Sequence, residues 1–434
     1  MTPAARSVTC CSRTCCCADR AADRGHGILV IVARIELTDF RNYTHGVVEL
    51  GSGVTVILGP NGQGKTNLVE AIGYLATGSS HRVSNDHALV RFGENAATVR
   101  ATLRHGDREV LMECQINRSG ANRLLVNRSI VRSREARRYI DSVLFAPEDL
   151  SIIRGEPSGR RRVLDALIVT ITPRMSSVMS DYERVVRQRT TLLKSARATR
   201  VAADALSTLD IWDDRLAQLG AEIMIARDDL VRQLVPRVDA AYQRIAGTDQ
   251  RVRLTMTTTI DGSDAEDDDL QVGPSSRFAR SGTESASVVE RAQRDETHPT
   301  HDEIRNRLLA RIAEVRRAEL DRAVTLVGPH RDDLLIELNG LPARGYASHG
   351  ESWSLALALR LASAELLRDT GAAGDPVVIL DDVFAELDEG RRGRLLDAVL
   401  GFEQVIITAA VGGDVPHLQD ARVVRILAGE VVDE

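Results

Sequence analysis

The sequence predicts an α/β fold whose strand-rich parts lie towards the two ends of the chain, with a helical domain inserted between them. Three observations support this prediction. Strand-like patterns occur in both terminal thirds, one strand runs into a glycine-rich turn and an amphipathic helix, and the middle of the chain adopts a helical period. With 434 residues, the chain is long enough for two or three domains with hydrophobic cores.

Residues 1–31 are expected to be a disordered extension. They hold five of the six cysteines, Cys10, Cys11, Cys15, Cys16 and Cys17, and only Cys114 lies elsewhere. Thiols in such number could bind zinc, but the cluster has no paired Cys-x-x-Cys and no second group of ligands. A single cysteine in the rest of the chain is typical of a reducing cytoplasm, and no apolar run reaches the ~18 residues that span a membrane. We therefore expect a cytoplasmic protein without membrane partners.

Residues 32–150 begin with short strands. Alternation between residues 32 and 58 predicts strands separated by turns at Asn42 and at Gly51 to Gly53. The same pattern then resumes, and further strands are expected at 99–103, 109–116 and 123–126.

The most informative segment is the run Gly59-Pro60-Asn61-Gly62-Gln63-Gly64-Lys65-Thr66. It follows the apolar residues 54–58 and precedes an amphipathic stretch at 67–77, which is the strand, turn and helix context of a phosphate-binding loop. Glycines let the backbone wrap a triphosphate with its N–H groups pointing inward, and the helix N-terminus adds partial positive charge. Lys65 would reach the β- and γ-phosphates, and the Thr66 hydroxyl would ligate Mg²⁺.

The alternative is an accidental glycine-rich turn. Average residue usage would produce these four fixed positions by chance in roughly one chain in a hundred of this length. Composition makes chance less credible still, because the chain has two lysines, Lys65 and Lys194, against 54 arginines. Almost every basic position is Arg, yet the loop keeps its Lys. We therefore predict that a nucleoside triphosphate and Mg²⁺ bind here.

Residues 151–323 are expected to form a helical arm domain. Apolar residues keep a three-to-four spacing from Leu164 to Leu193, and Thr172-Pro173 interrupts the pattern where a new helix would begin. Another helix is expected from about Leu206 to Leu234, ending near Pro236. About thirty residues make roughly 45 Å of helix, so the arm is no long coiled coil.

The net charge of −6 is unevenly distributed. A strand is expected at 251–260 and a helix at 304–318, and between them residues 262–303 hold eleven acidic and four basic residues. That segment carries −7, which leaves +1 for the rest of the chain. Its acidic and polar composition cannot bury enough apolar surface to fold, and we expect a disordered insertion.

Residues 118–162 are the opposite case, with eleven arginines, five acids and a net charge of +6. A DNA-facing surface is expected there, with Arg160, Arg161 and Arg162 as candidate phosphate contacts. The alternative is a solvated arginine-rich face in an arginine-rich protein.

Residues 324–434 return to an α/β pattern, with helices expected at 351–368 and 391–400 and strands at 377–380 and 405–408. The apolar strand Val377 to Leu380 ends in Asp381 and Asp382. A buried parallel strand would carry Asp381 to the sheet edge where the phosphate loop also lies. Asp381 would hold Mg²⁺, usually through water, and Asp382 would orient or deprotonate the attacking water.

Ser348-His349-Gly350-Glu351 opens the first of these helices. Ser-x-x-Glu is an N-terminal capping box, which explains the motif in purely structural terms. The Ser348 hydroxyl and the Gly350 backbone at a helix N-terminus also form an anion site that could meet the γ-phosphate of a nucleotide held by another protomer.

The order of four motifs along the chain resembles that of an ABC-type ATPase head. These motifs are the phosphate loop, Ser348 to Glu351, the strand that ends in Asp381 and Asp382, and Leu387-Asp388. The 282 positions from Thr66 to Ser348 exceed what a compact transporter subunit needs, and the gap lacks the hundreds of coiled-coil residues of SMC-type heads. Three further strings make the chain similar to the RecF family of bacterial DNA replication and repair proteins from Val32 to about Ala428. They are Leu37-Thr38-Asp39-Phe40-Arg41-Asn42-Tyr43, Phe145-Ala146-Pro147-Glu148-Asp149-Leu150 and Gly328-Pro329-His330-Arg331-Asp332-Asp333.

This resemblance implies a two-lobed ABC-type ATPase head that binds ATP and Mg²⁺ and forms a homodimer when ATP is bound. It implies binding to gapped DNA, with its single-stranded and duplex parts, alongside RecO and RecR in gap repair and the SOS response. The same resemblance implies a role for each residue of the site. Gly59 to Thr66 would bind the nucleotide, Thr66 and Asp381 would bind the metal, and Lys65 and Asp382 would be catalytic. The second protomer would complete the site with Ser348, Gly350 and Asp388, and Arg41 and Asn42 would approach the base or ribose.

Two positions depart from the general ABC pattern, since Asp382 stands where Glu is usual and Thr408 where His is usual. A shorter carboxylate reaches less well toward an attacking water, so we expect weak DNA-dependent hydrolysis that acts as a switch. The alternative is an ATPase subunit of a transporter or of an SMC-like complex. The arginine-rich region favours the DNA-binding protein.

Overall fold

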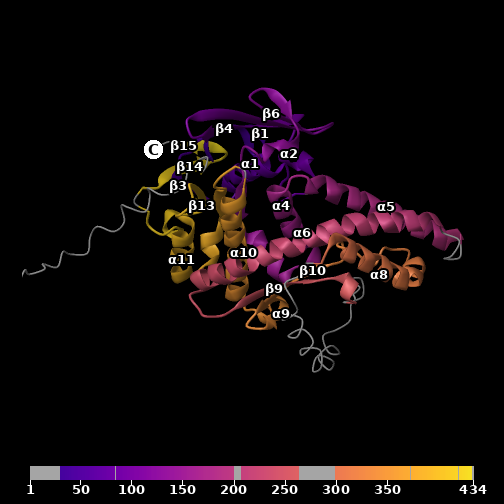
Figure 1. Cartoon of the computed structure of the whole chain (residues 1–434). Helices are drawn as coiled ribbons and strands as arrows, with labels where there is room; N and C mark the ends of the chain where they lie inside the picture. Colours follow the sequence, from indigo (N-terminus) through magenta and orange to yellow (C-terminus); the bar gives the residue numbers. More distant parts are fainter. Residues whose placement is uncertain are drawn as a thin grey trace, which may run out of the picture.

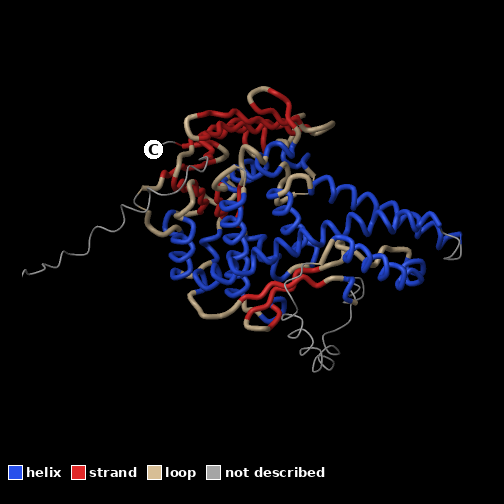
Figure 2. The backbone as a smooth tube through the Cα atoms, in the orientation of Figure 1, coloured by secondary structure: helices blue, strands red, loops and turns tan. Residues whose placement is uncertain are grey.

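The computed structural model describes residues 30–83, 85–199, 207–262, 299–371, 373–418 and 420–432. Two six-stranded sheets lie at one end of the molecule, and a helical arm extends away from these sheets (Figures 1 and 2). The predicted ABC-type α/β head with an inserted helical arm is confirmed. The cysteine cluster and the core of the acidic insertion lie outside the described residues.

The first sheet is antiparallel and built from the N-terminal part of the chain, in the order β2-β1-β4-β5-β6-β7. Its strands are β1 (Val30–Phe40), β2 (Tyr43–Glu49), β4 (Ala96–His105), β5 (Arg108–Asn117), β6 (Arg123–Val126) and β7 (Ser129–Val131). Alternate residues of β4 are buried, as the period-2 pattern predicts. Strand β1 begins at Val30, two residues earlier than expected, and Val30 and Ile31 are buried in it.

The second sheet joins strands from both ends of the chain, in the order β15-β14-β3-β13-β12-β8. They are β3 (Gly53–Leu58), β8 (Ser142–Phe145), β12 (Val377–Asp381), β13 (Gln404–Ala409), β14 (Arg422–Leu427) and β15 (Glu430–Val432). Strands β14, β3, β13, β12 and β8 run parallel, so their carboxyl ends share one edge. Every residue of β12 is buried, which explains its unbroken apolar run.

Helices cover both faces of this second sheet. Helix α1 (Lys65–Thr77) lies between the two sheets, where Leu68, Val69 and Ile72 pack into a common core. Helix α10 (His349–Thr370) packs on the opposite face, next to α11 (Glu389–Val399). The short helices α2 (Ser133–Ala136), α3 (Leu150–Arg154) and α9 (Ala343–Tyr346) fill the connections.

The arm is formed by α4 (Pro157–Ile171), α5 (Met175–Thr199), α6 (Ser207–Ala246) and α8 (His301–Arg322). Figure 1 shows α5, α6 and α8 extending together away from the sheets. The break at Thr172-Pro173 is confirmed, because α4 ends one residue before it. The predicted end near Pro236 is wrong, since α6 continues to Ala246. Pro236 removes only the bond to the Arg232 carbonyl, and buried Leu234 and Val238 hold the helix in the core on both sides of it.

A small sheet, β11-β10-β9, lies beneath the arm and contains β9 (Val252–Thr257), β10 (Asp333–Leu338) and β11 (Leu341–Pro342). The expected insertion ends earlier than residue 303, because Thr300 and Glu303 form a capping box that starts α8 at His301. Among the described residues, no helix combines the length and apolarity needed to cross a bilayer.

Candidate nucleotide-binding site

The glycine-rich loop connects the carboxyl end of β3 to the first residue of α1. Gly59 has φ 158 and Gly64 has φ 116. A Cβ on Gly59 would lie 2.2 Å from the Ile426 carbonyl oxygen, and one on Gly64 would lie 2.8 Å from Asn42 Nδ2. Both positions therefore require glycine, and the loop stays narrow enough for its N–H groups to surround an anion.

The Lys65 ammonium lies at the centre of this loop. Its Nζ donates to the carbonyl oxygens of Gly59, at 2.6 Å, and Pro60, at 3.1 Å. Burial lowers the pKa of Lys65, while the negative charges of Asp382 and Asp381 act in the opposite direction. A phosphate in the loop would supply the ammonium with the counter-charge that neutral carbonyls do not.

Asp381 lies at the end of β12, beside the loop. Its Oδ1 accepts hydrogen bonds from the hydroxyls of Thr66, at 3.2 Å, and Thr408, at 2.6 Å. Strand β13 lies between β3 and β12 and brings Thr408 to the pair. Burial raises the pKa of Asp381, and a divalent cation would restore the charge that burial disfavours. A hydroxyl and a carboxylate oxygen are ligands that suit Mg²⁺, so Thr66 and Asp381 fit this ion.

Asp382 adopts a left-handed backbone conformation, with φ 54, directly after the strand. Its backbone N–H donates to Thr408 Oγ1 at 3.0 Å, which fixes the turn. The side chain lines a cavity of about 290 Å³ together with Lys65 and Thr66. The structure therefore brings together the four chemical groups predicted at residues 65, 66, 381 and 382.

Arg82 also lines this cavity, and sequence reasoning missed it. Its Nη1 donates to Asn67 Oδ1 at 3.0 Å and lies 3.5 Å from Glu70 Oε2. Glu70 is fully buried on α1, and it also accepts hydrogen bonds from Arg41 and Ser80. Burial raises the pKa of Glu70, but these hydrogen bonds outweigh it and the pKa lies below its usual value. No motif marks Arg82, which only the close packing of its loop against α1 reveals.

The contacts of Arg41 and Asn42 brace the loop region. Arg41 donates from Nε and Nη2 to Glu70, at 2.9 and 2.7 Å, and from Nη1 to the Ala88 carbonyl at 3.0 Å. Asn42 donates to the Gln63 carbonyl at 3.0 Å and accepts from Asn67 Nδ2 at 2.7 Å. Neither residue lines the cavity in this conformation, and their approach to a base or ribose stays a prediction.

Ser348, Gly350 and Asp388 lie outside the cavity. Ser348 caps α10, with its N–H donating to Glu351 at 2.8 Å and its Oγ accepting from the Glu351 N–H at 3.3 Å. Asp388 caps α11 by accepting from the Arg391 N–H at 2.9 Å. A Cβ on Gly350 would lie 2.6 Å from Arg391 Nη1, so the two helix starts pack closely. Ser348 and Asp388 are exposed, and both remain accessible to a second molecule.

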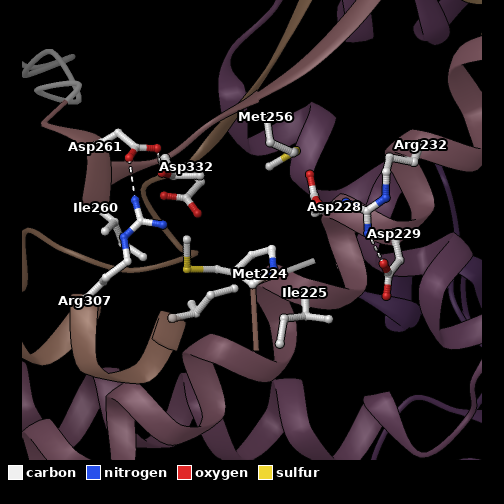
Figure 3. Close-up of a pocket in the computed structure, with 13 residues that line it drawn as sticks. Met224, Ile225, Asp228, Asp229, Arg232, Met256, Ile260, Asp261, Arg307 and Asp332 are labelled. Atoms are coloured by element: carbon white, nitrogen blue, oxygen red, sulfur yellow. Dashed lines mark hydrogen bonds and ion pairs between the residues drawn. The ribbon is translucent and has the colours of Figure 1, made fainter. Parts of the chain in front are cut away.

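A second cavity, between α6, β9 and α8, is unsuited to a nucleotide (Figure 3). Methionine and isoleucine side chains line much of it, and its polar groups include four carboxylates, those of Asp228, Asp229, Asp261 and Asp332. Two arginines accompany them, Arg307 pairing with Asp261 and Arg232 with Asp228 and Asp229. The aspartates in these pairs neutralise both arginine charges, and the remaining carboxylates would repel a triphosphate.

The expected DNA-facing surface is wrong at Arg160, because this residue is buried. Its side chain is 4% exposed, and its Nε and Nη2 each donate to an Asp333 carboxylate oxygen at 2.7 Å. Arg161 is half-buried and donates to the Asp332 carbonyl at 2.7 Å. Only Arg162 is exposed. The segment Gly328 to Asp333 thus acts as an anchor between the arm helices and β10.

Comparison with known proteins gives consistent results. The chain matches the RecF/RecN/SMC N terminal domain over residues 31–425. It is 54% identical over 404 residues to the DNA replication and repair protein RecF of Clavibacter michiganensis subsp. michiganensis (strain NCPPB 382), covering 93% of this chain and 96% of that protein. The RecF protein of Leifsonia xyli subsp. xyli (strain CTCB07) is also 54% identical, with coverages of 93% and 99%. Among solved structures, the recombination mediator protein RecF-ATP in the RecFOR pathway is similar, with TM-score 0.77, 29% identity and coverages of 94% and 98%.

Proposed function

Because this chain belongs to the RecF family of DNA replication and repair proteins, we propose that it is an ATP-dependent DNA-binding recombination mediator. The convergence of Lys65, Thr66 and Asp381 at one sheet edge carries this proposal. The solved RecF-ATP and RecF-ATPrS structures, which have the same fold, support ATP as the nucleotide.

In this proposal the residues of the site have separate roles in nucleotide binding, metal binding and hydrolysis. Lys65 and the loop N–H groups bind the β- and γ-phosphates, and Thr66 with Asp381 hold Mg²⁺. When bound, the ion would supply positive charge against the charge that develops on the phosphates. Asp382, which lines the same cavity, orients or deprotonates the attacking water. Its short side chain makes hydrolysis slow, so the nucleotide acts as a timer for DNA binding.

ATP-driven homodimerisation completes the site. Ser348, Gly350 and Asp388 do not line the cavity of their own chain, and Ser348 and Asp388 are exposed. A two-fold axis would place each set against the nucleotide of the partner. Ser348 already presents a helix N-terminus, whose partial positive charge favours a γ-phosphate. The dimer therefore forms with ATP and separates after hydrolysis.

The cellular role follows the family. The solved relatives are described as recombination mediators in the RecFOR pathway, which supports RecO- and RecR-type partners. The proposal further includes gapped DNA as the substrate, action in gap repair and SOS induction, and a cytoplasmic location. A partner-free test uses purified protein and a gapped duplex in a filter-binding assay with and without ATP, alongside light scattering. ATP-dependent retention of DNA together with an ATP-induced dimer supports the proposal. Dimerisation without DNA binding would point to an ATPase of another ABC-type assembly.

A further inference from the structure

A groove in the arm has a lining that the ATP site does not explain. It has a volume of about 560 Å³ and lies between α4, α5 and α6, beside Pro329 and His330. One face of α4 lines it over most of the helix, from Ser158 to Val169. Ser158, Ala166 and Ser176 at its rim are exposed, so the groove is open along its length.

The two carboxylates in the groove already have cationic partners. Asp165 accepts two hydrogen bonds from Arg227, both at 2.8 Å. Glu183 pairs with Arg187 at 3.6 Å. The ion pairs of these two carboxylates are therefore with Arg227 and Arg187, and not with Arg137, Arg161 or Arg162.

Three further arginines line the groove, and within the described part of the chain none has a carboxylate partner. Arg137 donates to the Ala166 carbonyl and the Thr170 hydroxyl, and Arg161 donates to the Asp332 carbonyl. Arg162 is exposed and makes no hydrogen bond among the described residues. This contrasts with Arg160, Arg189 and Arg227, which are buried against carboxylates.

Burial of a guanidinium that has no carboxylate bonded to it is unfavourable. Burial lowers the pKa of Arg137, although the charge of Asp141 acts in the opposite direction. Burial and the positive charge of Arg227 lower the pKa of Arg161, and the charges of Asp333, Asp332 and Asp165 oppose this shift without cancelling it. An anion that enters the groove would offset this cost and could accept hydrogen bonds from the unused N–H groups.

The arrangement of the cations favours a strand over a single small anion. Arg137 meets α4 at Ala166, five residues beyond Arg161, which corresponds to about 7–8 Å along the helix axis. The points at which Arg137 and Arg161 join α4 are thus spread along the helix axis and do not coincide. Neighbouring phosphates of an extended nucleic-acid strand are spaced on this scale.

We propose that this groove binds the sugar-phosphate backbone of a nucleic-acid strand through Arg137, Arg161 and Arg162. The inference rests on the proposed DNA-binding function and assigns it to a surface on the arm. The contacts involve phosphates alone, so binding at this surface is independent of base sequence.

The test measures the affinity for a fluorescently labelled gapped duplex against salt concentration, with ATP present. Arg162→Gln is the first variant, because Arg162 is exposed and supports nothing in the fold. We expect it to flatten the slope of log K against log salt by about 0.7–0.9, and Arg161→Gln/Arg162→Gln to flatten it by about twice as much. Arg317→Gln, on the exposed face of α8, removes the same charge from a site without a groove and should leave the slope unchanged.

The outcomes separate the two levels of inference. Wild-type protein that binds ATP but no DNA would overturn the proposed function itself. Normal wild-type binding with unchanged slopes in both groove variants would overturn the groove alone. A third arm titrates inorganic phosphate against thermal unfolding. Stabilisation that is lost in Arg161→Gln/Arg162→Gln, with DNA binding intact, would make this a site for free phosphate and would also overturn the proposal.

Discussion

The Thr66 hydroxyl donates a hydrogen bond to Asp381 Oδ1 at 3.2 Å, although 315 positions separate the two residues in the chain. Thr66 is the second residue of α1, the helix that follows β3, and Asp381 ends β12; only β13 lies between these two strands in the sheet. The arm and strands β4 to β7 of the first sheet occupy the sequence between Thr66 and Asp381 without separating the two residues in space. The proposed binding of nucleotide and Mg²⁺ at this pair would therefore tie the N- and C-terminal parts of the head together.

Lys65→Arg should abolish the ATP-induced dimer while leaving the fold intact. Lys65 is 6% exposed, and its ammonium donates to two loop carbonyls, a space that a planar guanidinium cannot fill in the same way. Light scattering with and without ATP measures the effect, and circular dichroism checks the fold. An ATP-induced dimer of this variant would show that Lys65 does not have the role assigned to it.

Arg160→Ala should lower the free energy of unfolding by about 3 kcal/mol, because it removes one partner of a largely buried ion pair. Arg162→Ala should change it by less than about 0.5 kcal/mol, since that side chain is exposed. Urea unfolding of both variants provides the comparison. Equal free energies of unfolding for the two variants would show that Arg160 does not stabilise the fold, and would favour the DNA-contact role predicted from the sequence.

The sequence predicts features that depend on local signals, and it does not predict burial that depends on distant partners, as at Arg160. The period of apolar residues located the strands, and the loop and Asp-Asp motifs located Lys65, Thr66, Asp381 and Asp382, because those signals are local. Burial of Arg160 depends on Asp333, a partner 173 positions away, and nothing near Arg160 in the sequence announces it.

Two further differences have the same origin. Arg82 enters the nucleotide cavity because Glu70 and Asn67 on α1 hold its loop, and no motif encodes that contact. Pro236 predicted a helix end, but tertiary packing of Leu234 and Val238 outweighs one lost backbone hydrogen bond. Local propensity was overridden in both cases by contacts between distant segments.

Asp332→Asn should stabilise the protein at pH 8 and have little effect near pH 4. Burial raises the pKa of Asp332 to about 6 from its ordinary value of 3.8, and its Oδ2 has no hydrogen-bond partner among the described residues. The favourable contribution of the protonated carboxyl is therefore complete below about pH 4 and is lost as the pH rises through 6, at a cost of about 3 kcal/mol. Thr259 can still donate to the Asn oxygen.

The measurement is thermal unfolding of wild type and variant from pH 4 to pH 8. The difference between their melting temperatures should grow across pH 4 to 6 and then level off. Asp333→Asn is the control, because it breaks the ion pair with Arg160 and should destabilise the protein at pH 8. A pH-independent difference for Asp332→Asn would contradict the raised pKa.

Asp382→Glu should increase the rate of ATP hydrolysis and shorten the lifetime of the ATP-bound dimer. Asp382 lines the cavity together with the loop residues, and one added methylene would extend the reach of its carboxylate toward the attacking water. Phosphate release under saturating ATP gives the rate, and Asp382→Asn, which removes the base, should slow it. Slower turnover in Asp382→Glu than in wild type would show that reach does not limit the reaction.

Ser348→Arg should still bind one nucleotide per monomer but fail to dimerise. Ser348 is exposed at the start of α10 and does not line its own cavity, so the variant leaves Lys65 and Thr66 untouched. In a two-fold dimer its bulky side chain would instead meet the nucleotide of the partner. Equilibrium binding of a fluorescent ATP analogue measures the first property, and light scattering measures the second.

Mixing Ser348→Arg with Lys65→Arg protein gives the decisive comparison. A mixed dimer can contain at most one composite site, the one that pairs the intact loop of the first variant with the intact Ser348 of the second. We therefore expect partial recovery of dimers in the mixture and none in either variant alone. Because we expect slow hydrolysis, the readout is dimer lifetime on gapped DNA and not turnover. If Ser348→Arg instead lost its monomer affinity for nucleotide, Ser348 would act within its own chain, and the shared-site dimer would have to be abandoned.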